Sequence, residues 1–175
     1  MFGAALYVPF RNRVPRHFAL VGAFAAVVPD FDVIGFRFGV NYADPLGHRG
    51  LTHSLIFAIA LGAAIVALSH ARAGQTRLAV WAYLALATAS HGIFDAFTDG
   101  GLGVALFAPF THERFFFPWR PIEVSPIGLS RFFSARGADV FMSELVWVGI
   151  PALAVALLGL AITRRRESRL TPRSG

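Results

Sequence analysis

Cysteine and lysine are both missing from this chain of 175 residues, and charged residues of any kind make up only 15% of it. Without cysteine there are no disulfide bonds and no thiolate ligands, so any metal site must use nitrogen and oxygen. Hydrophobic residues make up 55% of the chain, which is too many for an ordinary soluble domain. The composition therefore favours a small membrane protein with several crossings.

Other recognisable signals are absent too. The apolar run at residues 2–10 is short, has no basic leader and is followed by Arg11, so we expect no cleavable signal peptide. We find no nucleophile elbow, phosphate-binding glycine loop or His-Glu-x-x-His motif. The length fits one domain, expected over residues 1–163 and followed by a disordered basic tail at residues 164–175.

Long apolar stretches predict an all-α fold, a small multi-span helical bundle. The expected helices cover residues 17–28, 51–69, 78–97 and 145–162. A full crossing needs about 20 residues, so the last three should span the membrane. The first is short, and is expected to be tilted, sunk in the bundle or half of a broken span. Residues 97–143, rich in aromatics, should form a long, partly re-entrant extracytoplasmic lid.

The basic residues, all of them arginine, cluster at the ends of apolar stretches. One group precedes the first helix, a second lies between the second and third, and a third follows the last (Arg11, Arg13, Arg16; Arg72, Arg77; Arg164, Arg165, Arg166, Arg169, Arg173). Positive residues mark the cytoplasmic side, so the C-terminus is expected in the cytoplasm. The net charge of +6 then reflects topology, and no nucleic-acid partner is expected.

Polar residues that are costly in an apolar setting fall at the opposite, extracytoplasmic ends of these helices. His53 lies early in the second expected helix and His91 late in the third, and a short turn between the two helices places both at similar depth. His91 and Asp95 are four residues apart and share one helix face. In an extended segment, Asp30 and Asp32 also point to one side.

With His48, these side chains offer three imidazoles and three carboxylates. They form a plausible ligand set for one or two divalent metal ions (Asp30, Asp32, His48, His53, His91, Asp95). Plainer interpretations stay open from the residues alone. The two aspartates also suit a solvated pair that closes a loop, and His91 with Asp95 suits a hydrogen-bonded pair that joins helices. His48 lies in a glycine-flanked loop and would alternatively orient a substrate.

Further polar residues lie near the expected site. Arg49 and Arg114 suit a phosphate or carboxylate group, or else lie at the lipid interface with their heads in water. Glu144 should begin the last helix, as a helix N-terminal charge or as a further ligand. Three hydroxyl side chains are expected to cap helices or to support the ligands (Thr52, Ser54, Ser90).

Three motifs in this order resemble the YdjM-like family of predicted inner-membrane metal-dependent hydrolases. They are Pro29-Asp30-x-Asp32, His48-Arg49-Gly50-x-Thr52-His53-Ser54 and Ser90-His91-x-x-x-Asp95-x-x-Thr98. The resemblance implies a membrane protein with His and Asp metal ligands. The family is in turn distantly similar to zinc-dependent phospholipase C and fungal zinc nucleases, which are all-helical phosphodiesterases. Gly3 matches the glycine of the family's Thr-His-x-x-x-Gly helix start, so the matching histidine would fall before Met1.

Residues and resemblance together predict a membrane-embedded hydrolase of a bacterial or archaeal cytoplasmic membrane, with one or two divalent ions and zinc as the expected metal. Its substrate would be a phospholipid or another small amphiphilic phosphoester, reached from outside. Asp30 would accept the proton of the attacking water, and Arg49 would neutralise developing charge. The alternative is a non-catalytic, metal-stabilised scaffold or regulator. A metal-ion carrier ranks last, because the middle of the helices offers almost no polar residues.

Overall fold

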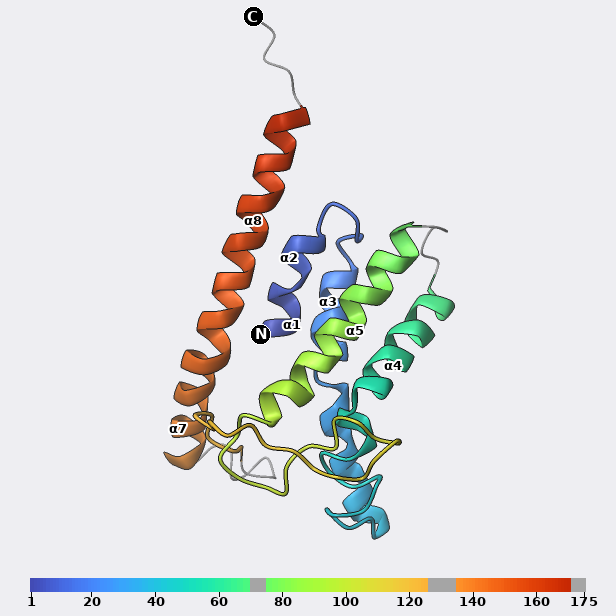
Figure 1. The fold of residues 1–175 in the computed structure, drawn as a ribbon, viewed down its shortest axis with the longest axis vertical. Coiled ribbons are helices and arrows are strands. Elements are labelled where there is room, and N and C mark those ends of the chain that lie inside the picture. Colours follow the sequence, from blue (N-terminus) through green and yellow to red (C-terminus); the bar gives the residue numbers. More distant parts are fainter. Residues whose placement is uncertain (70–74, 126–134, 171–175) are drawn as a thin grey trace, which may run out of the picture.

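The fold is entirely helical over the residues described by this computed structural model, which are residues 1–69, 75–125 and 135–170. Within them no β-strand forms, and only two isolated bridges occur, between Thr98 and Ile122 and between Val104 and Phe115. The all-α prediction is therefore confirmed. Figure 1 shows one long helix standing beside a group of shorter ones, with an irregular segment running across one end of the group.

The first half of the chain consists of short helices. They are α1 (Phe2–Ala5), α2 (Tyr7–Phe10), α3 (Phe18–Ala25), the 3₁₀ helix η1 (Val28–Phe38), the 3₁₀ turn η2 (Leu51–His53) and α4 (Leu55–Leu68). Ser54 caps α4, because its hydroxyl accepts a hydrogen bond from the Phe57 amide at 3.1 Å.

The second half contains the two longest elements. Helix α5 (Gln75–Asp95) packs along α4, as expected for neighbours joined by a short connection. The helices α7 (Ala135–Glu144) and α8 (Ile150–Leu170) are joined by a π-helical turn, η3 (Leu145–Gly149), and this continuous rod contacts α1 and α2. Pro151, the second residue of α8, has no N–H to donate to the π turn before it.

The core lies where α1, α3 and α5 meet. Tyr83 of α5 has no exposed surface, and its hydroxyl donates to the carbonyl groups of Gly3 and Ala19 at 3.0 and 3.3 Å. A Cβ on Gly22 would lie 2.2 Å from that hydroxyl oxygen, so α3 approaches α5 closely only because residue 22 is glycine. This crossing fixes η1, the continuation of α3, beside the far end of α5.

All four expected helices differ from the structure at their boundaries. Helix α3 ends at Ala25 rather than residue 28, and α5 covers Gln75–Asp95 rather than residues 78–97. The second helix begins at Leu55 rather than residue 51, because a 3₁₀ turn and the Ser54 cap precede it. The last helix begins at Ala135, ten residues earlier than expected, so Glu144 lies inside a continuous helix and is no N-terminal charge. The expected disordered tail is also wrong up to Leu170, where α8 ends.

Fewer helices than expected have the length and hydropathy needed to cross a membrane alone. Among the described residues, only Ala135–Arg165 is long and apolar enough to cross by itself, and α3 with η1, bent by 42°, would make a second crossing. Helix α4 has 14 residues and is about 21 Å long, which is less than the ~30 Å hydrocarbon core. The expected turn arginine Arg72 lies outside the described residues.

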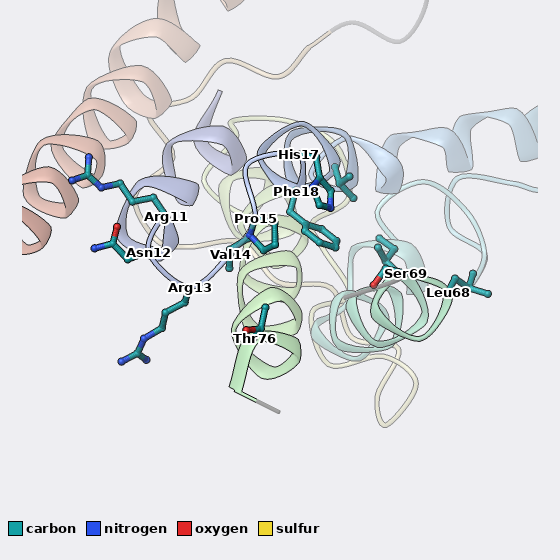
Figure 2. A pocket seen from close by; sticks show the side chains of 12 residues that line it. Arg11, Asn12, Arg13, Val14, Pro15, His17, Phe18, Leu68, Ser69 and Thr76 are labelled. Atoms are coloured by element: carbon teal, nitrogen blue, oxygen red, sulfur yellow. The ribbon is translucent and has the colours of Figure 1, made fainter. Parts of the chain in front are cut away.

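One end of the bundle brings together three segments that carry arginine. The loop after α2, the start of α5 and the end of α8 all lie toward this end (Figure 1). A cavity of about 950 Å³ also lies there, with Arg11, Arg13, Phe18 and Leu68 in its lining. In Figure 2 the two arginine side chains point away from Phe18, so the two guanidinium groups do not face its ring.

The Gly22–Tyr83 crossing yields a test of the fold. Gly22→Ala should lower the free energy of unfolding by about 1–3 kcal/mol, because the added methyl collides with a rigid buried ring. Thermal unfolding in detergent micelles would measure the change. Gly149→Ala is the matched control, since a Cβ there meets only ordinary contacts, the nearest at 3.4 Å. Equal stability of the two variants would contradict the close crossing.

Candidate metal centre

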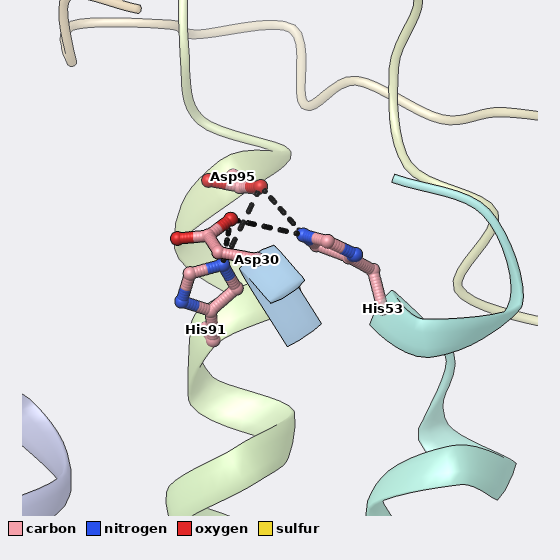
Figure 3. Close-up of side chains that lie close together, drawn as sticks. All are labelled: Asp30, His53, His91 and Asp95. Atoms are coloured by element: carbon pink, nitrogen blue, oxygen red, sulfur yellow. Dashed lines mark hydrogen bonds and ion pairs between the residues drawn. The ribbon is translucent and has the colours of Figure 1, made fainter. Parts of the chain in front are cut away.

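Four side chains from three separate elements converge on one point below the end of α5 (Figure 3). Asp30 comes from η1, His53 from η2, and His91 and Asp95 from successive turns of α5. The Nε2 atom of His91 lies 3.1 Å from Asp30 Oδ1 and 3.8 Å from Asp95 Oδ2. The Nε2 atom of His53 lies 3.6 and 3.3 Å from the same two oxygens.

These spacings fit a single metal ion. Four ligand atoms placed tetrahedrally at ~2.0–2.1 Å from zinc are about 3.3–3.4 Å apart, close to the spacings found here. All four candidate ligand atoms lie within 4.8 Å of one another. The expected pairing of His91 with Asp95 on one helix face is confirmed, and the two imidazoles of His53 and His91 lie with ring centres 5.0 Å apart, at the same depth.

His53 distinguishes a metal centre from an ordinary hydrogen-bonded cluster. Its side chain has no exposed surface, and its Nε2 is buried without a hydrogen-bond partner in the described structure. An unsatisfied buried polar atom costs about 1–3 kcal/mol, whereas a bound cation would satisfy it. Burial lowers the pKa of His53, but Asp30, Asp32 and Asp95 outweigh this effect and raise the pKa to about 10. The three carboxylates thus favour a positive charge at this position.

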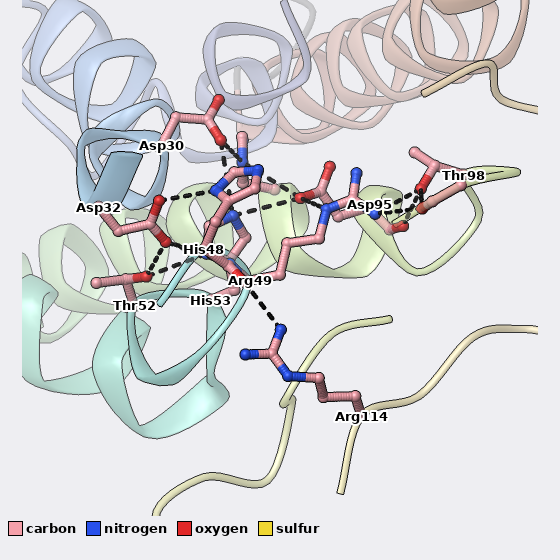
Figure 4. A network of polar contacts seen from close by, with 11 residues as sticks. Asp30, Asp32, His48, Arg49, Thr52, His53, Asp95, Thr98 and Arg114 are labelled. Carbon is pink, nitrogen blue, oxygen red and sulfur yellow. Dashed lines mark hydrogen bonds and ion pairs between the residues drawn. The ribbon is translucent and has the colours of Figure 1, made fainter. Parts of the chain in front are cut away.

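Asp32 lies on the other side of His53 and forms a second group (Figure 4). Its side chain is 1% exposed, and Oδ1 lies 2.7 Å from His48 Nδ1. Its Oδ2 accepts hydrogen bonds from the hydroxyl of Thr52 at 2.7 Å and from the backbone N–H of Arg49 at 3.3 Å, and lies 3.3 Å from His53 Nδ1. Asp32 therefore orients His53, as carboxylates commonly do behind metal-binding imidazoles.

The expectation that Asp30 and Asp32 point to one side of an extended segment is wrong. Both lie in the 3₁₀ helix η1, where residues two apart are rotated by about 240° around the axis. Asp30 consequently faces His91, while Asp32 faces His48. The two aspartates approach His53 from its two ring nitrogens instead of forming one pair.

Arg49 holds Asp95 in place from the loop before η2. Its Nε lies 3.1 Å from Asp95 Oδ2, and its Nη1 donates to Thr98 Oγ1 and the Gly100 carbonyl at 2.8 and 2.9 Å. Arg49 is 4% exposed and has a positive φ of 63°, a conformation that is uncommon for a residue with a side chain. Sequence reasoning named Arg49 but not Thr98 as a site residue, although Thr98 belongs to the third motif.

A glycine brings η2 against α5. A Cβ on Gly92 would lie 2.4 Å from the carbonyl oxygen of His53, so this approach needs a residue with no side chain. Gly92 was not predicted as a site residue, although its position directly after the expected ligand His91 could have indicated a close helix contact. Ser54 caps α4, which is one of the two roles expected for it. Arg114 donates to the carbonyl groups of His48, Tyr42 and Asp44.

Three of the four cluster residues, Asp30, His91 and Asp95, line a cavity of about 390 Å³ between α1, α3, α5 and η3. Its polar lining includes Asp30, His48, Arg49, Ser90, His91, Asp95, Glu123 and Glu144. The apolar part of the lining includes Val27, Phe94 and Val148. The segment after α5 closes one side, since Asp99 N donates to the Ile122 carbonyl at 2.9 Å and brings Ile122 and Glu123 to the cavity.

Comparison with known proteins places this arrangement in an inner-membrane class. The sequence profile of the YdjM inner membrane protein family matches residues 1–168, and the chain belongs to this family, as its three motifs predicted. The inner membrane protein YbcI of Escherichia coli (strain K12) is 41% identical over 155 residues, which are 87% of this chain and 87% of YbcI. No solved structure matches the chain.

Removal of a cluster ligand should abolish metal binding. His91→Ala and Asp95→Asn each delete one of the four converging atoms, so zinc affinity should fall by more than about 100-fold, beyond the loss typical of an outer-shell change. Elemental analysis of detergent-purified protein would measure zinc per chain. His112→Ala, which changes an exposed histidine outside the cluster, should bind as much zinc as the wild type. Equal zinc content in all the variants would contradict the assignment.

Proposed function

We propose that this protein is a membrane-embedded metal-dependent hydrolase. The observation that carries the proposal is the buried Nε2 of His53, which has no hydrogen bond in the described structure but faces carboxylate oxygens of Asp30 and Asp95 beside a cavity. Two imidazoles and two carboxylates suit zinc best among the common divalent metals, and an ion held by His53, His91 and Asp95 would keep a fourth position open for water beside Asp30. A bound divalent cation would activate water and polarise the bond to be cleaved.

The protein groups have separate roles in this proposal. Asp30 is the most exposed member of the cluster, with 45% of its side chain accessible, so it is the carboxylate that reaches water and accepts a proton. Arg49 positions Asp95 and contributes positive charge to the wall where negative charge develops. Ser90 and Glu144 line the same cavity and are available to contact substrate.

The proposed substrate is an amphiphilic phosphoester such as a phospholipid. The cavity joins the polar cluster to an apolar wall. Val27 in that wall is 48% exposed, and Phe24 of α3 is 59% exposed. A substrate with a polar ester group and an attached chain would match both parts. The resemblance of the family to zinc-dependent phospholipase C favours a phosphodiester as the bond that is cleaved.

We also propose a multi-span bundle whose site faces the outside. The segments that carry most arginines gather at one end of the molecule, and the cluster lies toward the opposite end of α5 (Figure 1). The excess of arginine then marks the cytoplasmic side and places the end of α8 in the cytoplasm. Helices α4 and α5, which pack against each other, would complete the membrane-embedded unit with α3 and the α7–α8 rod.

Hydrolysis by purified protein tests the function. Zinc-loaded wild type in detergent should cleave bis(p-nitrophenyl) phosphate or dihexanoyl phosphatidylcholine, followed by absorbance and by ³¹P NMR. His91→Ala and Asp95→Asn should lose at least 10³-fold in kcat/KM, and His112→Ala should retain full activity. Absence of turnover in a wild type that binds zinc would overturn the hydrolase proposal and favour the scaffold alternative.

Topology is tested separately with fusions to the end of α8. A green fluorescent protein fused after the last residue should fluoresce, whereas alkaline phosphatase fused at the same point should be inactive, because the latter folds only outside the cytoplasm. The opposite pattern would reverse the proposed orientation. A matched fusion within residues 112–113, in the segment on the cluster side, should show active phosphatase.

A further inference from the structure

Asp32, His48 and His53 also offer ligand atoms within 4.8 Å of one another, but the carboxylate of Asp32 is already occupied by close polar contacts on both oxygens. A carboxylate offers about four lone-pair positions, and four groups surround Asp32: His48 Nδ1, Thr52 Oγ1, the Arg49 amide and His53 Nδ1, at 2.7, 2.7, 3.3 and 3.3 Å. Since its side chain is also 1% exposed, Asp32 lies behind the two imidazoles and does not face the cavity.

The contact with Asp32 fixes the orientation of His48. Because His48 Nδ1 donates to Asp32 Oδ1, its other ring nitrogen, Nε2, is left to act elsewhere. Nε2 has no partner among the described residues, and His48 lines the same cavity as Asp30 and His91. His48 is 9% exposed, so it is buried rather than solvent-facing. It is also not one of the four residues of the cluster formed by Asp30, His53, His91 and Asp95.

The surroundings of His48 also hold its ring rigidly. Tyr42 and Phe36 pack edge-on to the imidazole, with ring centres 5.3 and 6.5 Å away. The guanidinium of Arg114 donates to the His48 carbonyl at 2.9 Å and fixes the backbone. A carboxylate behind one nitrogen and a cavity in front of the other is the arrangement that orients histidines for proton transfer.

We propose that Asp32 and His48 form a proton-donating dyad at a site with a single metal ion, with His48 as the catalytic acid and Asp32 as its positioning residue. This inference rests on the proposed hydrolase function and narrows it. It removes Asp32 and His48 from the six expected ligands, and it names the substrate class that needs them: phosphodiesters whose leaving group is an alkoxide, as in a phospholipid.

The proton balance of the step is complete. The oxygen of water forms a bond to phosphorus, and the bond from phosphorus to the ester oxygen breaks with its electron pair on that oxygen. His48, held through Nδ1 by Asp32, gives a proton from Nε2 to that oxygen, and the alcohol departs. The proton lost by the water passes through Asp30 to solvent, and a solvent proton returns to His48.

The test combines metal content with leaving-group dependence. His48→Asn keeps an amide donor for Asp32 but has no Nε2, and His112→Asn is the matched control. Zinc per chain, melting temperature and kcat/KM would be measured for both variants. The two substrates are bis(p-nitrophenyl) phosphate, whose leaving group needs no proton, and dihexanoyl phosphatidylcholine, whose alkoxide does.

His48→Asn should keep one zinc ion per chain and lose about 10²–10⁴-fold in kcat/KM on the phospholipid, but less than about 10-fold on the p-nitrophenyl diester. Equal losses on both substrates would overturn the dyad, and so would zinc loss matching that of His91→Ala.

If the melting temperature shows that His48→Asn is misfolded, His48→Gln takes its place with the same criteria. If the wild type cleaves neither substrate, the hydrolase function itself fails, and a wild type holding two zinc ions would refute the single-ion assignment independently.

Discussion

The imidazole of His53 is the point on which the polar interior of this protein depends. It has no exposed surface, and each of its two nitrogens faces a different group of carboxylates. Asp32 holds it from one side, and Asp30 and Asp95 face it from the other. Without this ring, η2 would lose its ion-pair contacts with η1 and α5 at the cluster. The chain brings costly polar atoms together inside an apolar bundle, and such atoms persist there only when each has a partner.

The packing around this ring explains several glycines and short elements of the fold. Gly92 lets η2 approach the C-terminal end of α5, and Gly22 lets α3 approach the same helix at Tyr83. Between these two close contacts, α3 gives way to a 3₁₀ helix that is tighter than an α-helix and turns its successive side chains by a larger angle. Helix α5 is therefore the centre of the packing, because α1, α2, α3, α4, η1 and η2 all contact it.

Much of this arrangement could be predicted from the sequence, for identifiable reasons. The spacing of His91 and Asp95 is a local property of an α-helix, and the depth of His53 follows from two helices joined by a short turn. The family motifs were equally readable. The directions of Asp30 and Asp32 were not, because a stretch beginning Val28-Pro29-Asp30 is compatible with both extended and 3₁₀ backbone, and only tertiary packing decides between them. The start of the last helix was missed for a related reason: residues 135–144 are not apolar, and a search for apolar runs stops at Leu145.

Arg49 shows what this construction demands of a single residue. Its backbone adopts a left-handed conformation that glycine would enter freely and that costs a residue with a side chain about 1 kcal/mol or more. The side chain reaches Asp95, Thr98 and Gly100 from that strained position. Stability and site geometry therefore favour different residues at this position. A glycine would relax the main chain but would leave Asp95 without the guanidinium group of Arg49. An arginine in this conformation indicates that the charge and reach of the guanidinium group outweigh the cost of the strained loop.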